Sequence, residues 1–265
     1  MEYISSRTNQ KIKDTVKLIN SSNERKEKEL FVVEGATLAA EAVASNFTIE
    51  KVFFTSYAKE RFKEQIIDIV EKALEAYEVS QEVAEKLSSM PSSQGIFCIL
   101  KYIEENELNS YLDERRIIIV DSIMEPQNLG AIARSAIAFG FNTLVVSPDS
   151  SDWLSPRALR ASMGALLHIN VVITDTKTAI SRLKENNFLT LAAAIKDNAI
   201  DISDVTVGEK LAIVIGNETN GLSEEIVKLC DKTVIIKTDS IMQSLNAAVA
   251  ASILMYTQRE KKIKD

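Results

Sequence analysis

The sequence has few of the residues on which metal sites and disulfide frameworks depend. Its 265 residues include two cysteines, Cys98 and Cys230, and a single histidine, His168. The cysteines are far apart and show no CxxC spacing, which argues against a disulfide framework and a zinc site, so we expect no metal. His168 lies in the apolar run 166–170, where a structural role is the simpler interpretation, and a Ser-His-Asp hydrolase therefore has little support.

Long apolar runs are missing as well. No stretch approaches the ~20 apolar residues that a membrane-spanning helix needs, and residues 1–7 lack the apolar core of a signal peptide. We therefore expect a cytoplasmic protein without membrane contact. The signatures GxxxxGK[ST] and GxGxxG are also absent, which argues against P-loop, kinase and dehydrogenase chemistry.

The remaining composition is that of a folded protein. A hydrophobic content of 46% can fill proper cores, and 265 residues allow one large domain or two modest ones. The net charge of −7 argues against a protein that coats nucleic acid nonspecifically, because such binding depends on many Lys and Arg contacts to phosphate. It does not exclude an enzyme that acts on a specific RNA.

The N-terminal half alternates helix and strand patterns. The hydrophobic spacing predicts helices over residues 10–20, 37–44, 59–73 and 81–88, and strands over residues 30–33, 52–54 and 95–100. This is the pattern of a small α/β domain, which we predict over residues 1–102. A polar, acidic segment over residues 103–114 is then predicted to be a linker.

The C-terminal half, residues 115–265, shows stronger strand patterns. Residues 116–120 form a continuous apolar run, which is typical of a parallel strand covered on both faces. Further strands are predicted over residues 143–146, 168–173, 188–193, 211–215 and 233–236, with helices between them. We therefore expect an α/β fold with a mostly parallel sheet and helices on both faces, which places ligands at the carboxyl ends of the strands.

A first polar segment, residues 126–134, enters a predicted helix at residues 129–139. Leu129, Ile132 and Ala133 fall on its apolar face, whereas Arg134 lies off that face among small residues. A guanidinium in such a place can be approached closely by phosphate, to which it donates paired hydrogen bonds. An ordinary surface arginine fits the spacing equally well.

Two more polar segments come after predicted strands. Gly216 directly succeeds strand 211–215, where a glycine lets a ligand touch the backbone, although Asn217 and Glu218 are also compatible with a plain turn. Ser244 and Asn246 precede an alanine-rich helix, and Ser244 could serve only as its N-cap. The alanine-rich surface permits close packing, either inside the core or against a second subunit.

In combination and order, these segments closely resemble the motifs of SpoU/TrmH-type RNA 2′-O-ribose methyltransferases of the SPOUT superfamily. The resemblance covers about residues 116–259, and its motifs are residues 121–140, 160–165, 216–223 and 244–246. The N-terminal half resembles that family's L30e-like substrate-binding domain. The positions that match its pattern are Ser6, Asn9, Ile12, Lys13, Arg25, Phe31, Glu34 and Gly35.

The resemblance implies a deep trefoil knot in the C-terminal half and a homodimer with active sites at the subunit interface. It also implies S-adenosyl-L-methionine as cofactor. The expected cofactor-binding residues are Gly216, Asn217, Ile236 and Leu245, and the expected catalytic and RNA-facing residues are Asn128, Arg134, Glu218, Ser244 and Asn246.

One departure from the family pattern is visible. The family usually has Ile-Pro-Met and a Gly before the Ser-Leu-Asn. In this chain, Ile236 is followed instead by Lys-Thr-Asp-Ser at residues 237–240. Since the cofactor contacts there are expected from the backbone, we expect the pocket to survive.

The expected activity is 2′-O-ribose methylation of structured RNA, with 23S ribosomal RNA as the leading candidate. A charged guanidinium has no acceptor lone pair, so we expect Arg134 to hold a phosphate and stabilise the developing alkoxide. Ser244, Asn246 or the RNA itself would then relay the proton. Two alternatives stay open, namely an RNA-binding protein that keeps the fold without catalysis, and a methyltransferase acting on a small molecule or a protein.

Overall fold

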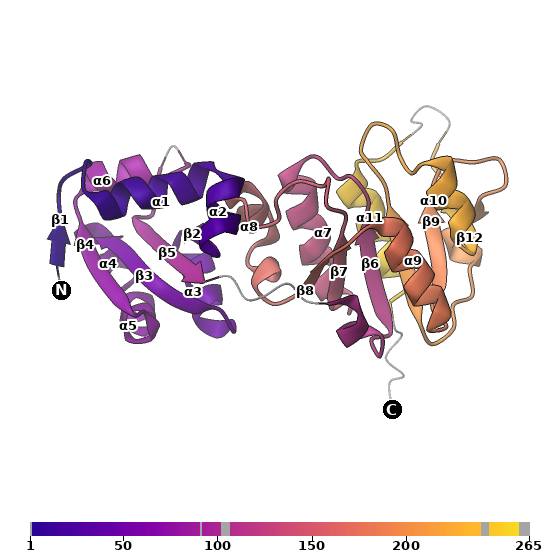
Figure 1. Ribbon diagram of the computed structural model, residues 1–265, viewed down its shortest axis with the longest axis horizontal. Helices are drawn as coiled ribbons and strands as arrows, with labels where there is room; N and C mark the ends of the chain where they lie inside the picture. The colour runs from indigo at the N-terminus through magenta and orange to yellow at the C-terminus, as the bar shows by residue number, and fades with distance from the viewer. Residues whose placement is uncertain (1, 91, 102–106, 240–243, 260–265) are drawn as a thin grey trace. The chain divides into compact units, whose positions relative to one another are not determined.

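The computed structural model describes residues 2–90, 92–101, 107–239 and 244–259. Its contacts divide the chain into two compact units, one made of residues 1–104 with 152–168, the other of residues 105–151 with 169–265. Most of the helices and strands of both units are labelled in Figure 1. Among the described residues, no helix combines the length and the hydropathy needed to cross a membrane.

The N-terminal unit is built on a five-stranded sheet with the order β1-β4-β3-β5-β2. The strands are β1 Glu2–Ile4, β2 Leu30–Glu34, β3 Thr48–Thr55, β4 Glu75–Val79 and β5 Ile96–Lys101. β5 runs antiparallel to both of its neighbours, whereas β1, β4 and β3 pair in parallel. The carboxyl ends of β1, β2, β3 and β4 therefore meet the start of β5 at one edge of the sheet.

Helices cover both faces of this sheet (Figure 1). They are α1 Gln10–Asn20, α2 Ser22–Lys28, α3 Ala36–Ala44, α4 Ser56–Arg61, α5 Lys63–Lys72 and α6 Gln81–Leu87. Phe53 and Tyr77 join a buried cluster with Ile12 of α1 and Val83 of α6. Because strand side chains alternate between faces, the buried Phe54 points to the opposite face, toward the α3 and α5 side.

A further segment, residues 152–168, belongs to this unit. It contains α8 Pro156–Ser162 and the 3₁₀ helix η2 Ala165–Leu167, and α8 contacts β2. The predicted boundaries at residues 1–102, 103–114 and 115–265 do not anticipate this grouping, and those boundaries stay a prediction.

The C-terminal unit is built on a seven-stranded sheet with the order β10-β12-β9-β11-β6-β7-β8. The strands are β6 Arg116–Val120, β7 Thr143–Val146, β8 Asn170–Ile173, β9 Leu189–Ala193, β10 Ile200–Asp201, β11 Leu211–Ile215 and β12 Lys232–Ile235. The described strand pairs of this sheet are all parallel. The α/β architecture with a large parallel sheet and a smaller N-terminal unit is thereby confirmed.

Helices pack on both faces of the large sheet as well. They are α7 Pro126–Ala138, α9 Thr176–Glu185, α10 Glu224–Leu229 and α11 Ala247–Thr257, with the 3₁₀ helices η1 Leu108–Tyr111 and η3 Ile202–Asp204. On one face, Ile119 and Val214 pack with Ile180 of α9 and Ile226 of α10. Helices α7 and α11 pack against each other and cover the other face of the large sheet (Figure 1).

Strands β6 and β11 are neighbours in this sheet, although their paired positions Arg116 and Leu211 lie far apart in the sequence. The backbone N–H of Asp121 donates to the carbonyl of Ile215 at 2.8 Å. The segments that leave these two strands therefore start side by side. The trefoil knot stays a prediction, and residues 240–243, between β12 and α11, lie outside the described residues.

Several helices and strands begin or end at other residues than predicted. The helix predicted over residues 59–73 is interrupted at Phe62, whose ψ of 44° leaves the helical range, so α4 and α5 are separate helices. The strand predicted from residue 168 begins at Asn170. His168 is exposed, ends η2 and hydrogen-bonds to Glu41 at 2.7 Å. Its role is thus structural, but in a surface hydrogen bond rather than an apolar strand.

Candidate functional site

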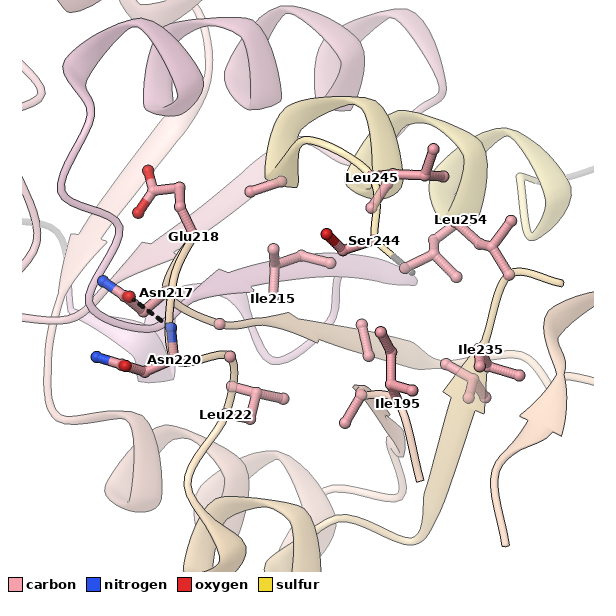
Figure 2. A pocket seen from close by; sticks show the side chains of 18 of the residues that line it. Ile195, Ile215, Asn217, Glu218, Asn220, Leu222, Ile235, Ser244, Leu245 and Leu254 are labelled. Atoms are coloured by element: carbon pink, nitrogen blue, oxygen red, sulfur yellow. Dashed lines mark hydrogen bonds between the residues drawn. The ribbon is translucent and has the colours of Figure 1, made fainter. Parts of the chain in front are cut away.

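A cavity of about 380 Å³ opens at the carboxyl ends of β9, β11 and β12. Its walls combine polar and apolar groups, and the apolar side chains include Ile195, Ile215, Leu222, Ile235 and Leu254 (Figure 2). This volume lies within the roughly 300–1,000 Å³ that is typical of small-molecule sites. The cavity lies where parallel α/β sheets bind ligands, outside the carboxyl ends of the strands.

Gly216 forms the base of a tight turn beside the cavity. A Cβ atom at this position would lie 2.5 Å from the backbone N of Leu222 and closer still to the carbonyl carbon of Gly221. The chain doubles back here because the N–H of Gly221 donates to the carbonyl of Asn217 at 2.9 Å. Only glycine fits, and the backbone of the turn is thereby brought to the cavity wall.

Asn217 holds the turn together. Its Oδ1 accepts from the backbone N–H of Thr219 at 2.9 Å and of Asn220 at 3.0 Å, and the second contact is drawn in Figure 2. Its Nδ2 donates to the carbonyl of Ser122 at 2.7 Å. Asn217 therefore links the segment after β11 to the segment after β6.

Glu218 connects this turn to the start of α7. Its carboxylate accepts from the backbone N–H groups of Met124 and Glu125, each at 3.1 Å, and from Nδ2 of Asn128 at 2.9 Å. Partial burial acts to raise the pKa of Glu218, but the hydrogen bonds from Asn128 and from these backbone amides outweigh it and lower the pKa. Glu218 is therefore an ionised acceptor that positions the loop before α7.

Asn128 continues the same chain of hydrogen bonds to α11. Its Oδ1 accepts from Nδ2 of Asn246 at 2.9 Å. Asn246 is the N-cap of α11, and its Oδ1 accepts from the N–H groups of Ala248 at 2.9 Å and Val249 at 3.2 Å. The interpretation of Ser244 as the N-cap was wrong, because the helix starts at Ala247 and Asn246 alone is correctly placed to cap it.

The other predicted cofactor-side residues surround the cavity. Asn217, Ile236, Ser244 and Leu245 all line it, together with Gly216. Ser244 is exposed, and its hydroxyl makes no hydrogen bond to a described residue. The Ser244 hydroxyl therefore faces the cavity and does not stabilise the described part of the chain through a hydrogen bond.

Arg134 is not joined to this network within one chain. It lies on the exposed side of α7 and forms neither a hydrogen bond nor an ion pair with a described residue. Exposed apolar side chains lie on the same two packed helices, since Ile137 of α7 is 36% exposed and Val249 and Tyr256 of α11 are 48% and 53% exposed. The structure thus brings Asn128, Glu218 and Asn246 together and leaves Arg134 on an uncovered, partly apolar face of the same unit.

The segment that departs from the family pattern lies partly at the cavity. Ile236 and Thr238 line the cavity, while Lys237 is 74% exposed and lies 3.6 Å from Asp201. Ser240 lies outside the described residues. The altered side chain at position 237 therefore points to solvent and to Asp201.

One charged wall of the cavity was not predicted from the sequence. Lys196, in the loop after β9, lines the cavity and forms an ion pair with Glu224 at the start of α10. The loop of residues 194–199 carries no motif, so only its position after a β-strand could have pointed to it. Among the described residues, no group of three or more His, Cys, Asp or Glu side chains could hold a metal ion.

Comparison with known protein families and sequences gives a consistent result. Residues 115–256 match the SpoU rRNA Methylase family, and residues 9–98 match the MRM3-like substrate binding domain. A Staphylococcus haemolyticus protein named for the TrmH family of tRNA/rRNA methyltransferases is 31% identical over 87% of this chain and 96% of its own length. The 23S rRNA (guanosine(2553)-2′-O)-methyltransferase RlmP of Bacillus subtilis is 26% identical over 98% of this chain and 100% of its own length.

Solved structures show the same fold. The crystal structure of the AdoMet-bound rRNA methyltransferase from Sinorhizobium meliloti superposes with a TM-score of 0.86, covering 97% of this chain and 96% of that chain at 22% identity. The family match spans more than half of the chain and includes the turn at Gly216, the Glu218–Asn128–Asn246 chain and nearly all of helix α11. The protein therefore belongs to the SpoU rRNA Methylase family.

Proposed function

We propose that this protein is an S-adenosyl-L-methionine-dependent RNA 2′-O-ribose methyltransferase whose substrate is 23S ribosomal RNA. The observation that carries the proposal is the hydrogen-bonded chain from Glu218 through Asn128 to Asn246, which stands beside a cavity at the carboxyl ends of the strands. Support also comes from the family match and from relatives whose names describe rRNA methyltransferases.

The residues around the cavity fit the proposed cofactor. S-adenosyl-L-methionine combines a flat adenine with a polar ribose and amino-acid chain. Apolar walls at Ile215, Leu222 and Leu254 suit the adenine, and the close backbone approach at Gly216 offers amide and carbonyl groups to polar atoms. Gly216, Asn217, Ile236 and Leu245 would hold the cofactor, which supplies an electrophilic methyl group when bound.

The hydrogen bonds of Asn246 restrict its part in proton transfer. Its Oδ1 already accepts from two helix N–H groups, and its Nδ2 donates to Asn128. No acceptor is left to receive a proton from the ribose hydroxyl. We assign Asn246 a positioning role and assign Ser244, whose hydroxyl faces the cavity and can both donate and accept, the contact with the ribose 2′-oxygen.

Arg134 would act from a second subunit. Within one chain it has no described partner, and the face of α7 and α11 around it exposes Ile137, Val249 and Tyr256. Covering this face with a second copy would bury apolar side chains and bring a guanidinium to the partner's cavity. There it would hold an RNA phosphate and stabilise the developing alkoxide, because it offers paired donors and no acceptor.

The choice of ribosomal RNA rests on the relatives and on the N-terminal unit. The relative from Bacillus subtilis is named as a 23S rRNA 2′-O-methyltransferase, and residues 9–98 match a substrate-binding domain. A separate domain of this kind suits a structured RNA recognised by shape and by unpaired bases. With this substrate we also propose a cytoplasmic location for the protein.

The test is transfer of labelled methyl from S-adenosyl-L-methionine to total RNA from cells that lack this gene. Wild type should label a single RNA size class, that of 23S ribosomal RNA, and mapping of the product should place the label on a ribose 2′-oxygen. Arg134→Ala should fold, dimerise and bind cofactor but transfer methyl at least about a hundredfold more slowly. A folded wild type that binds RNA and leaves every size class unlabelled would favour a noncatalytic RNA-binding protein instead.

A further inference from the structure

The motif at residues 160–165 has no part in the cavity or its hydrogen-bond network, since it folds with the N-terminal unit. Two of its residues have clear structural tasks. The buried Ser162 hydroxyl donates to the carbonyl of Leu159 at 2.7 Å and accepts from the N–H of Gly164 at 3.2 Å. Gly164 has a φ of +95°, and a Cβ there would lie 2.8 Å from the Cβ of Glu41. Ser162 and Gly164 thus build the turn that ends α8.

Arg160 contributes nothing to that turn through its side chain. Its Nη1 donates to the hydroxyl of Ser89 at 2.8 Å, and its guanidinium forms no ion pair with a described residue. Other cations of this unit do, since Lys28, Lys51 and Lys59 each pair with a glutamate. A partly exposed arginine held by one neutral hydroxyl keeps most of its donors available to a ligand.

Ser89 belongs to a serine-rich segment, whose described residues are 88–90 and 92–95, and this segment is anchored on a buried carboxylate. Glu34, only 9% exposed, accepts from the hydroxyls of Ser88 at 2.5 Å, Ser89 at 3.0 Å and Ser93 at 3.3 Å, and from the N–H of Ser89 at 3.1 Å. The negative charge of Glu34 is therefore satisfied inside this segment. Ser89 in turn presents its oxygen to Arg160 and fixes where that guanidinium lies.

A second arginine stands one helical turn before Arg160. Arg157 is exposed, and residues three apart on a helix are neighbours on its surface. Arg157 also forms no hydrogen bond or ion pair with the part of the chain that the structure describes. Two guanidinium groups without carboxylate partners among the described residues thus share one side of α8.

The start of this segment is pinned by a buried ion pair. Arg25, only 6% exposed, donates from Nε at 2.8 Å and from Nη2 at 2.5 Å to the same oxygen of Asp152. Its Nη1 donates to the carbonyls of Leu18 at 2.5 Å and Ile19 at 3.1 Å. Segment 152–168 is therefore rigidly joined to α1 and α2, and the two arginines of α8 are presented on a fixed support.

We propose that Arg157 and Arg160 bind phosphates of the RNA substrate, with Ser89 and Glu34 positioning Arg160. This inference rests on the proposed function, because the ligand is the RNA that the enzyme methylates. Guanidinium groups bind phosphate through paired hydrogen bonds, and contacts to phosphate orient an RNA without reading its sequence. The role of the pair is to hold the RNA on the N-terminal unit, so it affects RNA affinity rather than the chemical step.

The test uses the full-length protein and a 23S ribosomal RNA transcript, with filter binding over a series of NaCl concentrations. The slope of log K against log[NaCl] is negative, and each phosphate contact that is lost should reduce its magnitude by roughly 0.7–1. We expect Arg157→Ala with Arg160→Ala to reduce the magnitude of the slope by about twice that amount. The double variant should also raise KM for RNA at least about tenfold, with kcat and cofactor affinity near the wild-type values.

Two further variants separate binding from structure. Arg160→Lys keeps the positive charge but loses the planar guanidinium that donates paired hydrogen bonds. It should therefore keep the salt slope and lose only part of the affinity for RNA. Arg61→Ala removes an exposed arginine at the end of α4 and should change neither slope nor KM. A double variant that matches wild type in slope and KM would overturn the inference. It would also be overturned if Arg160→Lys lost as much RNA affinity as the double variant and had a lower Tm than wild type. A wild type that neither binds nor methylates the transcript would overturn the proposed function itself.

Discussion

Asn246 donates a hydrogen bond to Asn128 at 2.9 Å, and this contact ties the N-cap of α11 to the first turn of α7 across 118 residues of chain. Asn128 at the same time donates to Glu218 at 2.9 Å. One amide therefore connects the segments that come after β6, β11 and β12. The cavity and the start of both helices are held as a single unit by side chains rather than by backbone pairing.

Replacing Glu218 by Gln should loosen this arrangement. The Glu218 carboxylate accepts from three donors, the N–H groups of Met124 and Glu125 and Nδ2 of Asn128. A glutamine has one acceptor oxygen, and its NH₂ group is itself a donor, so at least one of these hydrogen bonds is lost. We expect the free energy of unfolding at neutral pH to fall by about 1–2 kcal/mol. Urea unfolding of wild type and Glu218→Gln measures this difference, and an unchanged midpoint would contradict it.

The same carboxylate predicts a pH dependence. The pKa of Glu218 is lowered in the folded protein, so its stabilising contribution is present above its unfolded-state pKa and is lost as the pH falls through the folded-state pKa. The difference in unfolding free energy between wild type and Glu218→Gln should stay constant from about pH 6 to 8 and shrink below about pH 4. A difference that grew on acidification would show that the sign is wrong.

Gly216→Ala should damage the cavity through a backbone clash. The added Cβ would lie 2.5 Å from the backbone N of Leu222, which cannot move without opening the turn. We expect affinity for S-adenosyl-L-methionine, measured by calorimetry, to fall at least about tenfold, equivalent to ~1.4 kcal/mol. Gly208→Ala is the matched control, because no atom lies within 4 Å of a Cβ there, and it should bind cofactor as wild type does.

Val249→Glu should prevent dimer formation if the face of α7 and α11 is the subunit interface. Val249 is 48% exposed in the single chain, and a carboxylate buried there without a partner would cost several kcal/mol. We expect a monomer by sedimentation and loss of methyl transfer. Ile67→Glu is an equivalent change at an equally exposed position of α5, also 48%, and should leave the protein dimeric and active. A dimeric Val249→Glu would place the interface elsewhere.

Asp152→Ala should destabilise the N-terminal unit strongly. It leaves the guanidinium of Arg25 buried without its carboxylate, a change that typically costs about 3–5 kcal/mol. The double variant Arg25→Met, Asp152→Ala removes both charges, and its loss of unfolding free energy should be smaller than the sum of the two single losses. Chemical denaturation of the four proteins in a double-mutant cycle tests this, and additive losses would show that the pair is not coupled.

Local patterns predicted most of the regular structure. The continuous apolar run at residues 116–120 and the helical spacing at residues 10–20 correspond directly to β6 and α1. The patterns missed helix α2 and strand β4, which has five residues, and they also failed at shorter elements and at one helix break. Strand β1 has three residues and β10 has two, too few for periodicity. The break at Phe62 separates α4, which contacts β3, from α5, which contacts both β3 and α3.

The candidate site was predictable as a set of residues, but the functions of its members were not. Motif order identified Asn128, Glu218 and Asn246, yet it could not show that Asn246 caps α11 and so has no acceptor free for a proton. It also missed Lys196, whose place at the cavity depends on where the loop after β9 meets α10. Such contacts join segments that are distant in sequence.

Sequence alone determines many of the strands and helices, the polar residues at strand ends and the family they resemble, because these depend on local periodicity and residue type. Packing decides which of those residues touch. Glu218 meets Asn128 across 90 residues, and Asp152 meets Arg25 across 127, in a segment that sequence assigns to the other half of the chain. Contacts at such separations exist only once the sheets have assembled and buried their apolar faces, since no local pattern encodes which distant partner a side chain will reach.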